Sequence, residues 1–387
     1  MKKQYIFLCT ILTAGALLFG SLSCKKKTEP EDIEIWKKEA LQQYAIVVQA
    51  SYDDSFETAE SLRDKIVAFL ANPTESGFES CKSAWLAARN PYGQTEAYRF
   101  YSGPIDDGDG PEGLLNAWPM DESFVDYVAG NPTAGVINKP ATYPNITKEL
   151  IVGLNELFSE QSIFCGFHAA EFLLWGQDLS TTGPGTRPFT DYAAGGTSAN
   201  QDRRGTYLTV VANLILEHLE SVRAEWRTSG AYYNEFINLN PAKKSMGLIF
   251  SGLEAFTYDE LAGERMFVAI DLGDQEHEHS CFSDNTIADI KMNLLGVRNV
   301  YFGSYTDSNG FTVSGRSFDE LATRLAPDKA AEVRAAFTLA ETKVNAIPAP
   351  FDQSIQNEKA KITEAIEALR ALGIQLAEVG VEIGAEF

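Results

Sequence analysis

Apolar residues recur at steps of three and four along most of this sequence, which is the spacing of amphipathic α-helices. Residues 33–71 show it clearly, with Leu41, Val48 and Leu62 on one stripe. The same spacing predicts further helices over residues 76–90, 94–100, 147–176 with a break near 160, 206–227, 242–270, 289–295, 318–347 and 354–387. Asn-Pro pairs at 72–73 and 90–91 are expected to end the first two helices. Runs of Val, Ile and Thr of strand length are almost absent, so the chain is predicted to be all-α.

Two stretches interrupt this helical pattern. Residues 101–127 are dense in Gly, Pro and Asp, and they are expected to form an ordered irregular segment. Residues 177–204 form a connection far longer than the usual length of about four to six residues, and such loops are usually functional or disordered. A chain of 387 residues also exceeds the size at which one core stops growing. We therefore predict two helical-bundle subdomains, over residues 35–190 and 191–387, with a site-bearing cleft between them.

The N-terminal segment has the pattern of a secretion signal. Lys2 and Lys3 precede an apolar run that is too short to be a good membrane-spanning helix. The stretch SLSC, ending at Cys24, resembles a loose bacterial lipobox, in which the signal is cut before a cysteine that then carries lipid. The alternative is an ordinary cleavable signal with an incidental cysteine. We predict a lipoprotein signal peptide at 1–23, lipidation of Cys24 and a tether at 24–34, and hence a cell-envelope protein anchored to the outer membrane on its periplasmic or surface face.

Charge and cysteine content narrow the range of partners. The chain has 32 basic and 54 acidic residues, a net charge of −22, so nucleic acid is not an expected partner. An acidic protein attracts cations only where carboxylates converge, so net charge alone names no ligand. Beyond the signal and Cys24, the cysteines are Cys81, Cys165 and Cys281, each among apolar neighbours. We predict buried free thiols, with one disulfide as the alternative.

The stretch GFHAAEFLLWG carries the most informative pair, His168 and Glu171. Residues three apart share a helix face, and both faces of this helix are apolar or small, so it is predicted to be buried all round. A buried carboxylate needs a metal ion, a proton or an arginine, because desolvating it alone costs several kcal/mol. A metal ion shared with His168 is one solution, and a structural His–Glu hydrogen bond is the alternative. The zinc-peptidase motifs HExxH and HxxEH are both missing, the latter because Phe172 follows Glu171.

The remaining histidines give weaker signals. His277 and His279 alternate with glutamates, and in an extended segment they would point the same way and could bind a metal. The alternative is a solvated acidic loop. His218 lies in an amphipathic helix and is predicted to be structural.

Several of these stretches together resemble the imelysin-like family. GFHAAEFLLWG is similar to its GxHxxE signature, and Arg187-Pro188 with Asp191-Tyr192 is similar to its RPxxDY stretch. Upstream, AWLAARNPYGQTEAYRFYSGPID and EGLLNAWPMDESFVDY resemble the family's first block, and downstream DELAGERM and EHSCFSDNT resemble its second. The resemblance extends in order over about residues 80–305.

This resemblance implies a two-domain helical fold with His168 and Glu171 at a cleft between the halves. It also implies links to iron-regulated uptake and, through the family's name, to an insulin-cleaving metallopeptidase. On that basis Glu96, Arg99, Asp106 and Arg187 become candidates to line the cleft. Relatives often have a histidine after the SDNT segment, where this chain has Ile287, so any metal contact made there by relatives would be lost or altered.

Two functions follow from these observations. The first is a lipid-tethered binding protein that holds a divalent metal (iron, zinc or calcium) or a haem-like ligand at His168 and Glu171, and delivers it to an envelope transport partner. The second is a metallopeptidase with His168 as ligand and Glu171 as ligand or general base. A peptidase needs a further ligand, such as His277 or His279, and an open position for water. Because a full zinc set is missing from the sequence, binding is the favoured function.

Overall fold

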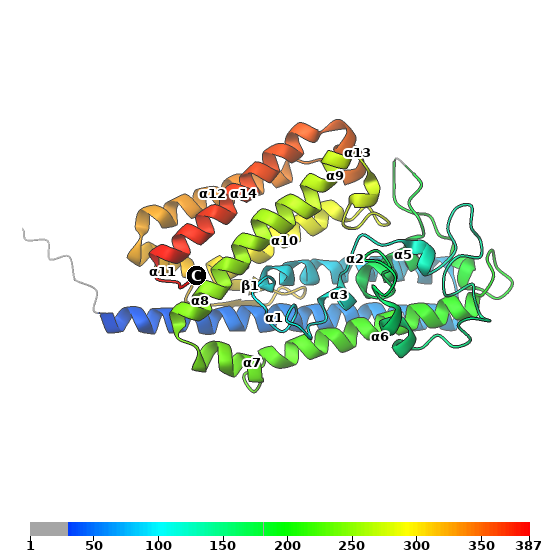
Figure 1. Ribbon diagram of the computed structural model, residues 1–387, viewed down its shortest axis with the longest axis horizontal. Helices are drawn as coiled ribbons and strands as arrows, with labels where there is room; N and C mark the ends of the chain where they lie inside the picture. The colour runs from blue at the N-terminus through cyan, green and yellow to red at the C-terminus, as the bar shows by residue number, and fades with distance from the viewer. Residues whose placement is uncertain (1–29, 181) are drawn as a thin grey trace, which may run out of the picture.

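The computed structural model describes residues 30–180 and 182–387, and it confirms the all-α prediction (Figure 1). The predicted signal peptide, Cys24 and the first part of the tether lie outside the described residues. The first helix, α1, begins at Pro30, so the last residues of the predicted tether are helical. Among the helices that the structure describes, none has the length and apolarity that crossing a bilayer requires.

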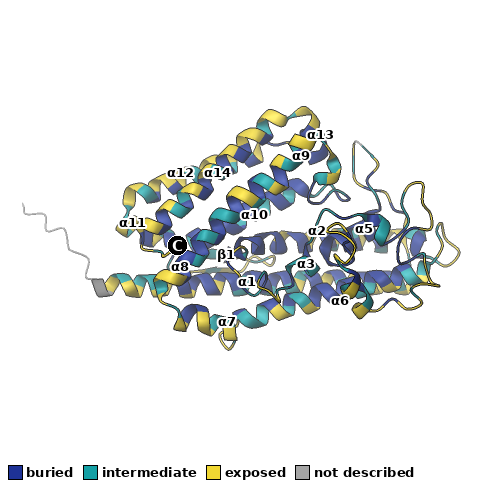
Figure 2. Ribbon diagram, viewed as in Figure 1, coloured by how far each residue is buried: buried dark blue, intermediate teal, exposed yellow. Residues whose placement is uncertain are grey.

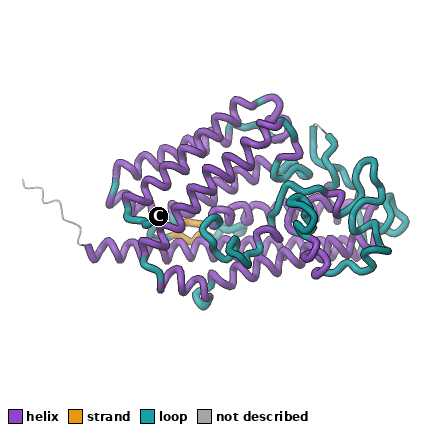
Figure 3. The backbone as a smooth tube through the Cα atoms, viewed as in Figure 1, coloured by secondary structure: helices purple, strands orange, loops and turns teal. Residues whose placement is uncertain are grey.

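The first layer of the molecule is built on α1, a helix of 42 residues (Pro30–Ala71). Two long helices pack along it, α2 (Glu75–Thr95) and α6 (Gln201–Trp226) (Figure 1). Loops gather at one end of this layer (Figure 3), and short elements complete it there and along the long helices, with α7 away from that end (Figure 1). These elements are η1 (Glu96–Tyr98), α3 (Glu112–Leu115), η2 (Glu122–Phe124), α4 (Lys148–Leu154), α5 (Gly166–Trp175), η3 (Phe189–Tyr192), α7 (Ala231–Tyr233) and η4 (Asn234–Leu239).

The second layer is built on α14 (Lys359–Glu382), which packs against α12, α8 and η5. The second layer contacts the first largely where α10 packs against α2. The remaining elements are α8 (Ala242–Ala255), η5 (Phe256–Phe267), α9 (Val268–Leu272), η6 (Gln275–His277), α10 (Thr286–Phe302), α11 (Phe318–Leu325), α12 (Pro327–Asn345), α13 (Phe351–Asn357) and the antiparallel hairpin β1 (Ser304–Thr306) and β2 (Thr312–Ser314). Two helical bundles were expected and are found, but α6 packs with the N-terminal helices.

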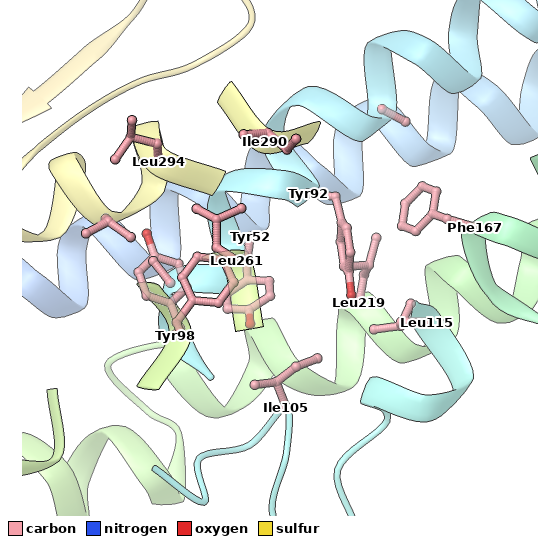
Figure 4. Close-up of a cluster of buried hydrophobic side chains, with 14 of the residues drawn as sticks. Tyr52, Tyr92, Tyr98, Ile105, Leu115, Phe167, Leu219, Leu261, Ile290 and Leu294 are labelled. Carbon is pink, nitrogen blue, oxygen red and sulfur yellow. The ribbon is translucent and has the colours of Figure 1, made fainter. Parts of the chain in front are cut away.

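Burial follows this two-layer arrangement. The outward faces of α12 and α14 are exposed, whereas the helix faces between the layers are buried (Figure 2). Aromatic and aliphatic side chains from both halves of the chain meet there, among them Tyr92 of α2, Phe167 of α5 and Ile290 of α10 (Figure 4). The rings of Tyr92 and Phe167 lie 4.6 Å apart between centroids. The core therefore fixes α5 against α2.

The break predicted near 160 in the helix over 147–176 is confirmed, because α4 ends at Leu154 and α5 begins at Gly166. Asn155 follows α4, and its side chain accepts a hydrogen bond from Phe164 N at 2.8 Å. The predicted end of the second helix is wrong, because α2 runs through Pro91 to Thr95 instead of ending before it. A proline inside a helix removes one backbone hydrogen bond. Burial of the last turn, with Tyr92 fully enclosed, outweighs that loss.

The helix predicted over 242–270 also differs, because its central part is π-helical. The segment η5 joins α8 to α9, and its hydrogen bonds reach from residue i to i+5. This wider winding places Glu260 beside Arg265, whose Nε donates to Glu260 Oε1 at 2.9 Å. Long π-helical segments are rare and often mark functional sites.

Candidate functional site

The position of α5 depends on its first residue, Gly166. Its φ is +85°, and an added Cβ would lie 2.5 Å from the carbonyl oxygen of Leu115. Only glycine adopts this backbone conformation freely, and no side chain fits there. The close approach brings the end of α3 against the start of α5, so that Asn116 lies next to the predicted site. Every residue of α5 is buried, as the sequence pattern predicted.

His168 and Glu171 contact one another directly within α5. His168 Nδ1 and Glu171 Oε2 form a hydrogen bond of 2.9 Å. Glu171 Oε1 accepts two further hydrogen bonds from Ser283, from its amide at 2.9 Å and from its hydroxyl at 2.7 Å. Burial raises the pKa of Glu171 to about 8, although the Ser283 hydrogen bonds oppose the rise. Both oxygens of Glu171 are therefore used to hold the His168 ring in one orientation.

The second nitrogen of His168 is the unusual atom of the site. Nε2 is buried, and no group of residues 30–180 or 182–387 forms a hydrogen bond with it. Burial lowers the pKa of His168, and the positive charge of Arg89 adds to this, so the ring is neutral near pH 7. With a pKa of about 8, Glu171 is largely protonated near pH 7, so its O–H donates to Nδ1 and the ring hydrogen stays on Nε2. When Glu171 loses its proton, Nδ1–H donates to it and Nε2 has a free lone pair. A neutral imidazole with one nitrogen fixed by a carboxylate is the form that ligates metals.

A second histidine, His279, lies against the first. The two rings are 4.7 Å apart between centroids, at 70°. His279 Nε2 lies 3.3 Å from Asn116 Nδ2, and its Nδ1 lies 3.2 Å from Asp289 Oδ2 and 3.4 Å from Arg89 Nη2. We call the six residues His168, Glu171, His279, Arg89, Asn116 and Asp289 the histidine cluster. They come from α2, α5, α10 and the loops after α3 and η6.

The two histidines of the sequence DQEHEHS lie in different surroundings. His279 and Glu278 are buried, each only 2% exposed, so a solvated acidic loop is the wrong description of this segment. His277 ends η6, is partly exposed and lines a pocket. The structure thus brings His279, and not His277, against His168.

A pocket of about 430 Å³ adjoins the cluster on the Asn116 side. Arg99, Glu112 and Glu260 are among its walls. Glu96 lies beneath it, accepting hydrogen bonds from Arg265 and from Arg99, the latter at 3.1 Å. Asn116 Nδ2 lies 3.4 Å from the other oxygen of Glu96. Two predicted residues, Glu96 and Arg99, are therefore linked to the histidine cluster through Asn116.

The carboxyl groups around this pocket differ in their pKa values. Burial opposes ionisation of Glu96, but Arg265 and Arg99 outweigh it and lower the pKa of Glu96 to about 2. Burial also raises the pKa of Glu112, to about 7, although Arg99 opposes the rise. The carboxylate beneath the pocket, Glu96, therefore stays ionised, whereas Glu112 in its wall exchanges a proton near neutral pH.

A larger pocket of about 930 Å³ adjoins the cluster on the Ser283 side, and Arg187 lies in its wall. The Arg187 guanidinium is largely committed within the protein, because Nη1 donates to Asp126 Oδ2 at 2.7 Å, although its buried Nε has no partner among the described residues. Arg204 also donates to Asp126, at 2.6 and 2.9 Å, and Arg187 approaches Asp191 at 3.4 Å. We call Asp126, Arg187, Asp191 and Arg204 the arginine cluster. His168 and Glu171 themselves lie behind the walls of the two pockets.

Asp106, another predicted residue, is placed apart from the cluster. Its carboxylate accepts hydrogen bonds from the amides of Phe100 and Gly103, the latter at 3.0 Å. It thus stabilises the turn in which it lies. Within the part of the chain that the structure describes, no hydrogen bond or ion pair joins it to the histidine cluster.

Other predicted residues have structural positions. Cys81, Cys165 and Cys281 are free, and none forms a disulfide within the described ranges. Burial raises the pKa of Cys81 to about 12, so its thiol is unreactive at neutral pH. His218 is partly buried on α6, and Ile287 is a core residue of α10.

Four members of the site environment were not identified from the sequence: Arg89, Asn116, Ser283 and Asp289. Arg89 had a detectable signal, because it follows Cys81 and Trp85 at steps of four on the buried stripe of α2. A charged residue in such a stripe must find partners when the helix packs. Ser283 and Asn116 lie in irregular segments, where periodicity gives no signal.

Comparisons with known proteins agree with this fold. The sequence model of the family Peptidase_M75, described as imelysin, matches residues 48–376. Iron-regulated protein A of Synechococcus elongatus is 23% identical over 326 residues, which are 82% of this chain and 77% of that protein. A crystal structure of a protein described as an iron-regulated protein A precursor, from Parabacteroides distasonis, matches with a TM-score of 0.71 and 18% identity, over 90% of this chain and 95% of that one.

Proposed function

This chain belongs to the imelysin family, and on that premise we propose that it binds an iron ion or an iron-containing ligand for uptake at the bacterial cell envelope. The names of the two relatives, both iron-regulated protein A, support the link to iron. The observation that carries the proposal is the buried His168 Nε2, which no described group engages. A buried polar atom without a partner is costly, and a bound ligand would remove that cost.

The surroundings of His168 suit an iron cargo. Imidazole nitrogen is a good ligand for iron, and Glu171 and Ser283 hold the ring in place as carboxylates commonly hold metal-binding histidines. The pocket on the Asn116 side has Glu112, Glu260 and Glu264 in its walls, and converging carboxylates attract cations. In this proposal Glu171 orients His168 and completes the ligand set if it gives up the His168 hydrogen bond.

A metallopeptidase is the weaker alternative. Catalytic zinc usually has three protein ligands and an open position for water. Among the described residues, no group of three His, Cys, Asp or Glu with ligand atoms within 4.8 Å of one another includes His168. Both oxygens of Glu171 are engaged, so it is also poorly placed as a general base. The site therefore favours binding over hydrolysis.

We further propose that Cys24 carries a lipid anchor in the outer membrane. The first described helix begins at Pro30, six positions later. Even a fully extended link of this length reaches only about 20 Å, so the helical domain would stay close to the membrane surface. Incorporation of radiolabelled palmitate, lost in Cys24→Ala, is the expected result. Labelling that persists in this variant contradicts the anchor.

Metal titration tests the binding site. Purified protein is titrated with ferrous iron under anaerobic conditions and with ferric citrate, by calorimetry. His168→Ala should weaken binding at least about tenfold, because it removes the proposed nitrogen ligand. His218→Ala is the matched control, since His218 Nε2 is also buried without a partner but lies on α6 away from the cluster. Equal affinity in His168→Ala and wild type contradicts the proposal.

A peptide-cleavage assay with zinc-loaded protein separates the two functions. Binding predicts iron affinity without cleavage. Cleavage that disappears in both His168→Ala and Glu171→Gln, but not in His218→Ala, would establish the peptidase instead.

A further inference from the structure

A second group of acidic side chains lies in the loop between η6 and α10, outside the site proposed for iron. Glu278 and Asp284 belong to this loop, and Asp352 lies in the first turn of α13. One oxygen from each of the three lies within 4.8 Å of the others. Segments 74 positions apart in the sequence thus bring three carboxylates to one point.

Glu278 is the member that requires explanation. It is only 2% exposed, and no described group donates a hydrogen bond of normal geometry to either of its oxygens. The Thr286 hydroxyl is near enough to oppose the rise in the pKa of this carboxyl, which burial causes. Asp284 Oδ1 and Asp352 Oδ1 are also buried without partners. No lysine, arginine or histidine of the described residues forms an ion pair with any of the three.

Three converging carboxylates, two of them buried and Asp284 half-buried, are unfavourable without a cation, because each opposes the ionisation of the others. Unlike the buried acid Asp126, this group has no arginine beside it. The described residues place no positive charge beside this group, so its carboxyl groups either take up protons or are compensated by a cation from solution.

The group has a route to solvent. Asp352 lies in the wall of a surface pocket of about 680 Å³, together with Asp178, Asp274 and Glu276. These additional carboxylates make the pocket attractive to cations and repel anions. A small cation can therefore reach Asp352 from solvent.

We propose that Glu278, Asp284 and Asp352 form a binding site for Ca²⁺. The three ligands are all carboxylate oxygens, and Ca²⁺ prefers oxygen ligands in flexible arrangements. Oxygens bound to one Ca²⁺ at about 2.4 Å can lie up to about 4.8 Å apart, and the three carboxylate oxygens lie within that distance of one another. The group contains no nitrogen or sulfur ligand, so it does not suit zinc.

The site would tie the η6–α10 loop to α13 in the second layer. The same loop carries His279, which lies against His168, and Ser283, which holds Glu171. Bound Ca²⁺ would therefore fix the segment that completes the histidine cluster, without itself contacting the cargo. The inference stands on its own group of ligands and does not require the proposed iron function.

Calorimetric titration with CaCl₂, after dialysis against EDTA, tests the site on the full protein. Wild type is expected to bind one Ca²⁺ and to melt at a higher temperature in Ca²⁺ than in EDTA. Asp352→Asn should weaken Ca²⁺ binding at least about tenfold and abolish the increase in melting temperature. Glu276→Gln is the matched control, because it removes one charge from the same pocket but lies outside the three-residue group.

The variants also separate this site from the others. Glu278→Gln should behave as Asp352→Asn does, and both should melt no lower than wild type in EDTA, since each removes a like charge. Glu171→Gln should keep its Ca²⁺ affinity whatever happens to iron binding. The proposal is overturned if wild type binds no Ca²⁺, if Asp352→Asn binds as tightly as wild type, or if Glu276→Gln is weakened equally.

Discussion

Asp126 and Glu278 are both buried carboxylates, and their surroundings are opposite. Asp126 accepts hydrogen bonds from Arg187, from Arg204 and from Asn138, the last at 3.0 Å. Burial opposes its ionisation, but Arg187 and Arg204 outweigh this and lower the pKa of Asp126 to about 2. Glu278 has no arginine, and burial raises its pKa to about 9.

Buried charges that are paired within the protein stabilise the fold, whereas buried acidic groups without a partner in the protein are candidates for binding a ligand. The arginine cluster supplies its own compensation, so it needs nothing from solution. Glu171 is intermediate, because the protein satisfies its oxygens but leaves His168 Nε2 without a partner. An unpartnered buried atom indicates a binding site where it lies beside other potential ligands, as His168 Nε2 and the Glu278 oxygens do, and not where it is isolated, as in His218.

Loss of the Asp126 charge should have the largest effect on the fold. Asp126→Asn leaves Arg187 and Arg204 buried without their counter-ion, and we expect a loss of about 3–5 kcal/mol in the free energy of unfolding. Urea denaturation at pH 7 measures it. Glu217→Gln, which removes an exposed partner of Lys148, is the control and should leave stability unchanged. A loss below about 1 kcal/mol would show that the arginine cluster contributes little to stability, and would contradict the contrast between Asp126 and Glu278.

Acid should weaken the same cluster. Because the pKa of Asp126 in the folded protein is lowered from 3.8 to about 2, its contribution is complete above pH 4. That contribution, about 2.5 kcal/mol, is lost as the pH falls through about 2. Denaturation between pH 5 and pH 2 should therefore show a steeper loss for wild type than for Asp126→Asn. Parallel curves for the two proteins would contradict the lowered pKa.

Removing one of the hydrogen bonds to Glu171 should have a smaller effect, and this effect should be on iron affinity alone. Ser283→Ala removes the hydroxyl donor to Glu171 but keeps the amide donor, so His168 is held less firmly. We expect iron affinity to fall by about tenfold. Ser245→Ala is the control, since its buried hydroxyl donates only to the backbone oxygen of Phe236. An equal fall in both variants would indicate general loosening of the structure.

The smallest effect is expected for Glu278 in the absence of cation. In EDTA at pH 8, Glu278→Gln should be as stable as wild type or more stable by up to about 1 kcal/mol, because Glu278, with a pKa raised by burial to about 9, must take up a proton on folding and glutamine need not. Thermal unfolding measures this. A clear destabilisation would mean that Glu278 has a stabilising partner, and would remove the contrast with Asp126.

Much of the fold could be predicted because it depends on local periodicity. The stripe containing Leu41, Val48 and Leu62 predicted α1, which does end at Ala71. The end of α2 could not be predicted, because the burial of Tyr92 against Phe167 outweighs the local effect of Pro91. Tertiary contacts determine where such helices end, and these contacts cannot be read from a single sequence.

The site was partly predictable for the same reason. His168 and Glu171 are three residues apart on one helix, so their contact follows from helix geometry. His279 reaches His168 from over a hundred positions away, and Asp352 reaches Glu278 from 74 positions away. The spacing of residues along the sequence does not show which distant segments come into contact. The proposed lipid anchor, the domain division at 190 and 191 and the roles of the site residues stay predictions.

The π-helical segment η5 makes this region sensitive to chain length. Glu260 and Arg265 meet because five steps of a wide helix bring them to the same side. Deleting one residue between them would allow ordinary α-helical winding to resume, and every later side chain of the segment would rotate by about 100°. Arg265 would then leave Glu96, and the floor of the Asn116 pocket would keep only Arg99 as counter-ion. Insertions and deletions, more than substitutions, should therefore be the changes that relatives avoid here.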